Sequence, residues 1–144
     1  MEYRMLGASG LEVSVLSFGT MTLGGEGRFA AMGNVQVEEA RRHVEICLEA
    51  GVNLFDTADI YSFGKSEEVL GQALGARRKE IVLATKVFVR LEAGTNRAGL
   101  SRRHILEACE ASLAVWEPIT SISTRPTTLT PSRRSKRPCA PSRI

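Results

Sequence analysis

The chain has 144 residues, of which 43% are hydrophobic and 24% are charged, as is typical of one soluble domain. No window approaches the roughly 18 apolar residues of a membrane span, and the N-terminus lacks the layout of a secretion signal, so we expect a cytoplasmic protein. Cys47, Cys109 and Cys139 are widely spaced and form no CxxC pair, which indicates neither a disulfide framework nor a metal site.

The net charge of +3 is distributed unevenly. Residues 1–116 carry 13 Lys/Arg against 15 Asp/Glu, whereas residues 117–144 carry six Lys/Arg against Glu117 alone. All five prolines lie in that second segment, and all 13 glycines lie before Ser101. This contrast predicts a folded portion over residues 1–113 and a basic Pro/Ser/Thr/Arg-rich tail over 114–144 that forms no domain of its own.

The first part of the chain predicts a hairpin, a loop and a helix. "EYRMLGASGLEVSVLSFG" alternates around a small-residue turn, which predicts a hairpin that runs into a strand over Val13–Phe18. A glycine-rich loop follows over residues 19–35. The next segment, 36–51, predicts a helix that ends at Gly51 and has these residues on one face: Val37, Ala40, Val44, Cys47 and Leu48.

Two further strand–helix units follow. "VNLFDTAD" predicts a short strand before a helix over 66–75, with Ser66 as N-cap and Gly75 at its end. "EIVLATKV" predicts a buried strand before a helix over 101–116 with Ser101 as N-cap. We expect His43 and His104 at the surface. The core-facing residues of this last helix are predicted to be Ile105, Leu106, Cys109, Ser112 and Leu113.

Three successive strand–helix units predict an α/β fold with a parallel sheet covered by helices. Two architectures fit this pattern, an open doubly wound sheet and a (β/α)8 barrel. A full barrel needs about 250 residues, more than this chain has.

Three reactive side chains are predicted to meet where the strands end. Asp56 ends the second strand of the sheet, Tyr61 follows in the next loop, and Lys86 ends the third strand. Active sites in such folds lie at this edge. A free tyrosine, with a pKa near 10, is a poor proton donor at neutral pH. A lysine ammonium beside it stabilises the phenolate, and a carboxylate keeps the lysine charged, which suits protonation of a developing alkoxide.

Other interpretations of these residues stay open. Each of the three alone is also typical of a cap, a solvated lysine or half-buried packing. The loop "FGTMTLGGEG" lacks the GK[ST] of a P-loop and the GxGxxG of a dinucleotide-binding turn, so it is only a weak signal for phosphate.

The segments "MEYRMLGASGLEVSVLSFGTM", "GVNLFDTADIYSFGKSEEVLGQAL" and "IVLATKV" closely resemble the aldo-keto reductases, in particular bacterial members related to potassium-channel beta subunits. The resemblance implies the N-terminal part of a (β/α)8 TIM barrel, incomplete in this chain, and NADPH-dependent reduction of a small-molecule carbonyl. By resemblance, Tyr61 is the proton donor and Lys86 and Asp56 tune it. Asp56 and the loop residues Gly19, Thr20 and Met21 are expected to border the cofactor.

The resemblance ends after Leu113. Family members continue with a pattern like RLxxDYIDLYQxHxxD, whose histidine is a fourth catalytic residue, whereas this chain reads "AVWEPITSISTRPTT". If the DNA is read in a shifted frame that begins at the last base of the Ala114 codon, the codons possible for this segment can encode R-L-G-T-D-Y-I-D-L-Y. We therefore expect residues from about Ala114 to be out-of-frame text, and the chain by itself to be inactive.

The sequence also allows two alternatives to an enzyme. One is a non-catalytic regulatory or binding subunit, which the likeness to channel beta subunits allows. The other is a nucleic-acid- or membrane-binding module that works through "RRSKR". That cluster lacks interleaved aromatic residues and amphipathic spacing, so we expect neither nucleic acid nor membrane as a partner.

Sequencing of the DNA that encodes Leu113 to Trp116 tests the frame prediction. We expect one inserted or deleted base there, and its correction should restore the family pattern through the position of Thr127. An uninterrupted frame in independently isolated DNA, with no such base, would show that the tail is the protein's own sequence.

Overall fold

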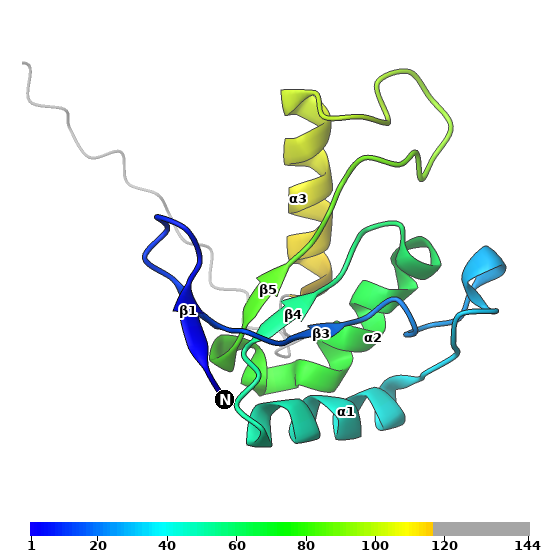
Figure 1. Ribbon diagram of the computed structural model, residues 1–144. Helices are drawn as coiled ribbons and strands as arrows, with labels where there is room; N and C mark the ends of the chain where they lie inside the picture. Colours follow the sequence, from blue (N-terminus) through cyan, green and yellow to red (C-terminus); the bar gives the residue numbers. More distant parts are fainter. Residues whose placement is uncertain (117–144) are drawn as a thin grey trace, which may run out of the picture.

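The computed structural model describes residues 1–116 (Figure 1). Two short strands, β1 (Tyr3–Met5) and β2 (Glu12–Ser14), form an antiparallel hairpin. Three more strands form a parallel sheet in the order β3-β4-β5: β3 (Ser17–Gly19), β4 (Leu54–Asp56) and β5 (Val82–Ala84). The helices are α1 (Val37–Glu49), α2 (Lys65–Leu74) and α3 (Arg102–Trp116), with 3-10 turns η1 (Gly27–Phe29), η2 (Tyr61–Gly64) and η3 (Gly75–Glu80).

The parallel sheet and its three strand–helix units confirm the predicted α/β architecture. The register aligns Gly19 with Asp56 and Asp56 with Ala84, so all three strands end level with one another. Residues that follow the three strands are thereby delivered to one edge of the sheet.

The predicted single strand over Val13–Phe18 is wrong, because the chain bends between β2 and β3. Ser14 is buried, and its hydroxyl donates to the Leu16 carbonyl at 2.6 Å and accepts from the Asn53 N–H at 3.1 Å. The Asn53 side chain in turn accepts from the Ser14 N–H at 2.7 Å. These local bonds hold the bend and let β2 stay with β1 while β3 pairs with β4.

The main core lies between the sheet and helices α1 and α2. Phe55 of β4 is fully buried at its centre and meets Phe18 edge-to-face, with 5.3 Å between ring centroids. The predicted face of α1 is confirmed: Ala40 and Val44 are buried, and Val37, Cys47 and Leu48 pack against the cluster. His43, expected at the surface, is half-buried with its ring 6.2 Å from that of Phe18.

The predicted end signals of the first two helices are confirmed, but one predicted N-cap is wrong. Gly51 and Gly75 follow α1 and α2 with φ of +81° and +50°. Helix α2 begins one residue earlier than predicted, with Gly64 as N-cap at φ +91°. Ser66 therefore lies inside the helix, where its buried hydroxyl donates to the Thr20 carbonyl at 2.7 Å.

The predicted core face of α3 is wrong except at Ser112. The Ser101 hydroxyl accepts from the His104 N–H at 3.2 Å, which confirms the N-cap. The buried residues are His104, Ser112 and Trp116, so the predicted surface position of His104 is also wrong. The other four predicted core residues are exposed: Ile105, Leu106, Cys109 and Leu113. Ser112 of α3 faces α2, where its hydroxyl contacts the buried carboxylate of Glu67.

Helix α3 continues to Trp116, so the predicted boundary at residue 113/114 falls within a helix. The rest of the predicted out-of-frame tail, residues 117–144, lies outside the described residues. Across residues 1–116, the structure has no helix that is both long and apolar enough to span a membrane.

Replacement of Phe55 by alanine should cost about 3–5 kcal/mol of unfolding free energy, because it leaves a cavity at the centre of the core. Phe88→Ala is the control, since that side chain is 63% exposed. Urea unfolding of both variants measures the difference, and equal midpoints would contradict the position assigned to the core.

Candidate active site

The candidate site lies at the edge of the sheet where β3, β4 and β5 end. Asp56 is the last residue of β4, Tyr61 begins η2 five residues later, and Lys86 follows β5 by two residues. The structure brings these three predicted residues into direct contact, although they are up to 30 positions apart in the sequence.

The ammonium of Lys86 is the centre of this group. Its Nζ donates to Asp56 Oδ2 at 2.6 Å and to the Thr57 carbonyl at 2.8 Å. The same nitrogen lies 3.4 Å from the Tyr61 hydroxyl and 5.1 Å from the centroid of the Tyr61 ring. One cation thus contacts both a carboxylate and a phenol.

The surroundings of Lys86 hold it in the charged form. Partial burial lowers the pKa of Lys86, but the hydrogen bonds to Asp56 and Tyr61, together with their charges, outweigh burial and raise this pKa above its ordinary value of 10.5. The side chain remains half exposed, so solvent screens these interactions.

Tyr61 is held by the turn that follows it. Ser62 and Phe63 both have left-handed backbone conformations, with φ of +50° and +54°. Non-glycine residues adopt this conformation only where other contacts stabilise it. Ser62 supplies such contacts, because its buried hydroxyl donates to the Leu23 carbonyl at 3.0 Å and accepts from the Gly25 and Glu26 N–H groups at 3.0 and 3.3 Å.

An aromatic side chain from the glycine-rich loop packs against this turn. Phe29 of η1 is buried, and its ring lies edge-to-face against both Tyr61 and Phe63, with centroid distances of 6.1 Å in each pair. The loop after β3 therefore fixes one side of the Tyr61 ring, while Lys86 lies on its face.

The predicted cofactor loop lies at the same edge. Gly19 is paired with Asp56 in the sheet, and the Thr20 N–H donates to the Asp56 carbonyl at 3.0 Å. Thr20 is fully buried, whereas Met21 is 40% exposed. Among residues 1–116, a Cβ built on Gly19 would meet no atom within 4 Å, so this part of the chain leaves open space beside that backbone. The residues present fit the expected cofactor at this edge.

A layer of buried polar groups below the site was missed by the sequence analysis. Glu67 and Asp59 are 3% and 6% exposed, and His104 of α3 is 8% exposed. Burial raises the pKa of Asp59, and the Ile60 N–H and the charge of His104 oppose that rise. Within residues 1–116, Asp59 Oδ2 and His104 Nε2 find no hydrogen-bond partner. The only sequence signal was the position of Glu67 in the first turn of a helix, which is equally typical of an exposed acid.

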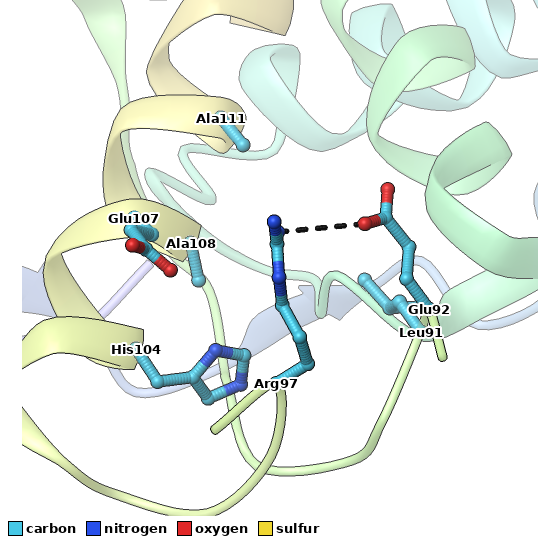
Figure 2. Close-up of a pocket in the computed structure, with 7 residues that line it drawn as sticks. All are labelled: Leu91, Glu92, Arg97, His104, Glu107, Ala108 and Ala111. Atoms are coloured by element: carbon cyan, nitrogen blue, oxygen red, sulfur yellow. Dashed lines mark ion pairs between the residues drawn. The ribbon is translucent and has the colours of Figure 1, made fainter. Parts of the chain in front are cut away.

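A cavity of about 130 Å³ lies between α3 and the segment that follows β5, and His104 is one of its lining residues (Figure 2). Arg97 points into it and pairs with Glu92 at 3.4 Å. None of Asp56, Tyr61 and Lys86 lines this cavity, so it is separate from the candidate site.

Replacement of Asp56 by asparagine should lower the pKa of Lys86, because the strongest partner of its charged form is lost. NMR titration of the Lys86 side chain measures this. Glu68→Gln is the control, since Glu68 pairs with Lys65 at 2.8 Å in the same way. A Lys86 titration that Asp56→Asn leaves unchanged would show that the pair does not form in solution.

Comparisons with known proteins agree with the fold. A plant protein described as "Probable voltage-gated potassium channel subunit beta", from Arabidopsis thaliana, is 45% identical over 117 residues, and its counterpart in Oryza sativa is 44% identical. Each alignment covers 78% of this chain and 33% of the relative, so the chain spans about a third of their length.

Among solved structures, an aldo-keto reductase from Bacillus halodurans, in its holo form, superposes with a TM-score of 0.66 at 40% identity. The match covers 82% of this chain and 37% of that protein. The model of the aldo/keto reductase family matches residues 15–116, from the bend before β3 to the end of α3. The chain therefore belongs to the aldo/keto reductase family.

Proposed function

We propose that the protein to which this segment belongs is an oxidoreductase that reduces a small-molecule carbonyl to an alcohol with NADPH. Family membership supports the reaction class. The single observation that carries the proposal is the contact of Lys86 Nζ with both Asp56 and the Tyr61 hydroxyl, at 2.6 and 3.4 Å.

In this proposal Tyr61 is the proton donor. When bound, the cofactor supplies a hydride to the carbonyl carbon. The oxygen then gains negative charge, and the Tyr61 hydroxyl gives it a proton. The ammonium of Lys86 stabilises the phenolate that remains, and Asp56 keeps Lys86 charged and oriented. The turn at Ser62 and Phe63 holds the phenol in position during the transfer.

The loop after β3 is proposed to border the nicotinamide. Gly19 leaves its backbone open, Thr20 is anchored to β4, and Met21 is exposed beside them. We further propose NADPH rather than NADH, and the cytoplasm as the compartment, both on the family resemblance stated above. Neither nucleic acid nor a membrane is needed as a partner for this reaction.

We also propose that the 144-residue chain by itself is inactive. It spans about a third of its curated relatives. By the family resemblance, a fourth catalytic residue and most contacts to the cofactor belong to segments beyond residue 113. The described residues supply the tyrosine, the lysine and the aspartate only.

A second candidate function is a non-catalytic regulatory or binding subunit. The observation that favours it is the 45% identity to the plant protein described as a channel beta subunit. The two functions differ in whether NADPH oxidation depends on added carbonyl compound.

A longer protein that carries this segment in the family reading frame should oxidise NADPH in the presence of an aldehyde or ketone. Tyr61→Phe should lower kcat by about 10²–10⁴-fold, the usual contribution of a general acid. Tyr3→Phe is the control, because its hydroxyl donates to the Gly51 carbonyl at 2.8 Å, before β4 begins, whereas the site lies where β4 ends. Spectrophotometry at the NADPH absorbance measures both.

Full turnover by Tyr61→Phe would show that Tyr61 is not the proton donor. NADPH binding without turnover, across a range of carbonyl compounds, would favour the regulatory subunit. Turnover by the purified 144-residue chain would contradict its proposed inactivity.

A further inference from the structure

The observation behind this inference is a buried carboxylate that connects three elements. Glu67 lies in the first turn of α2 and is only 3% exposed. Its Oε1 accepts a hydrogen bond from the Thr85 hydroxyl at 2.7 Å, just after β5. The Ser112 hydroxyl of α3 lies 3.2 Å from Oε1 and 3.1 Å from Oε2. One side chain thus binds both the end of β5 and the middle of α3.

Such a group is costly to bury, so its hydrogen bonds are strongly constrained. Burial raises the pKa of Glu67, the hydroxyls of Thr85 and Ser112 lower it in part, and the charge of nearby Asp59 raises it further. A buried acceptor that loses its donor is left with the cost of desolvation. The geometry of the donors is therefore tied to that of the carboxylate.

Thr85 is adjacent to Lys86, and this makes the contact relevant to the site. Thr85 points to the carboxylate beneath the sheet, and Lys86 points to Asp56 and Tyr61 at its edge. Rotation or displacement of the segment at Thr85 would move the ammonium of Lys86 as well.

Within the part of the chain that the structure describes, the main chain of this segment is hydrogen-bonded on one side only. The Thr57 N–H donates to the Ala84 carbonyl at 2.9 Å, and the Asp59 N–H donates to the Lys86 carbonyl at 3.2 Å. Both bonds come from the segment that follows β4. Within residues 1–116, β4 is the only strand that pairs with β5. The hydrogen bond between Thr85 and Glu67 restrains this segment from a second side, through helix α2.

We propose that Glu67 is a positioning residue for Lys86, and that it acts through the Thr85 hydroxyl. The contact between Glu67 and Ser112 has a different effect. It joins α2 to α3 and does not involve the residue next to Lys86. The catalytic consequence rests on the proposed function, but the placement of Lys86 does not.

The test compares three variants of the 144-residue chain. Thr85→Val removes the hydroxyl and keeps the shape of the side chain, and Thr85→Ser keeps the hydroxyl. Ser112→Ala removes the other hydrogen bond to the same carboxylate. NMR titration of the Lys86 side chain, assigned with Lys86→Arg, is the readout, and urea unfolding is measured in parallel.

We expect Thr85→Val to lower the pKa of Lys86, because its contacts with Asp56 and Tyr61 loosen while its partial burial remains. Thr85→Ser should leave the titration unchanged. Ser112→Ala should lower the unfolding midpoint but leave the titration of Lys86 at the wild-type value, an outcome that a merely structural role of Glu67 would not produce.

Two results would overturn the proposal: an unchanged Lys86 titration in folded Thr85→Val, or an equal shift in Ser112→Ala. If Thr85→Val does not fold, Thr85→Ala replaces it, since it removes the hydroxyl without a second methyl group beside the carboxylate, and the same two results decide. Full turnover by Tyr61→Phe together with a shifted titration in Thr85→Val would refute the proposed function and leave this inference standing.

Discussion

The parallel register of three short strands is the constraint on which the site depends. Gly19, Asp56 and Ala84 are level in the sheet, so the segments after each strand begin at the same height. A shift of one strand by one residue would exchange the two sides to which its side chains point. Asp56 would then leave the edge where Lys86 reaches it, and the ion pair at 2.6 Å could not form.

Hydrogen bonds from the first turn of helix α2 help to keep the three strands in this register. Ser66 and Glu67 are consecutive residues in its first turn. The first donates to the Thr20 carbonyl after β3, and the second accepts from the Thr85 hydroxyl after β5. One helical turn thus binds the ends of the two outer strands, and Lys86 bonds the Thr57 carbonyl after the central strand. Polar contacts fix the edge of the sheet, whereas apolar packing around Phe55 fixes its middle.

Much of this arrangement could be predicted from the sequence, because strand–helix alternation and strand ends are strong local signals. The proximity of Asp56, Tyr61 and Lys86 followed from the rule that parallel strands end at one edge of the sheet. What could not be predicted depends on contacts distant in sequence. Ser66 has the pattern of an N-cap, yet Thr20 binds its hydroxyl. Ser112 faces inward because its hydroxyl contacts the buried Glu67 of α2, and no spacing rule on α3 alone carries that information. The predicted roles in proton transfer and cofactor binding stay predictions.

The packing of the loop after β3 has a consequence for protein engineering. A methyl group on Gly27, where φ is +55°, would lie 2.6 Å from the Phe63 ring, and one on Gly25 would lie 2.6 Å from the Gly33 carbonyl. A side chain on Gly27 would displace the Phe63 ring beside Tyr61, and one on Gly25 would displace the main chain at Gly33 and Asn34. Arg28 and Met32 lie in the same loop and are exposed. Libraries that vary this loop should therefore change Arg28 and Met32 and keep Gly25 and Gly27 fixed, since a side chain at either glycine would clash with the loop itself or with the Phe63 ring.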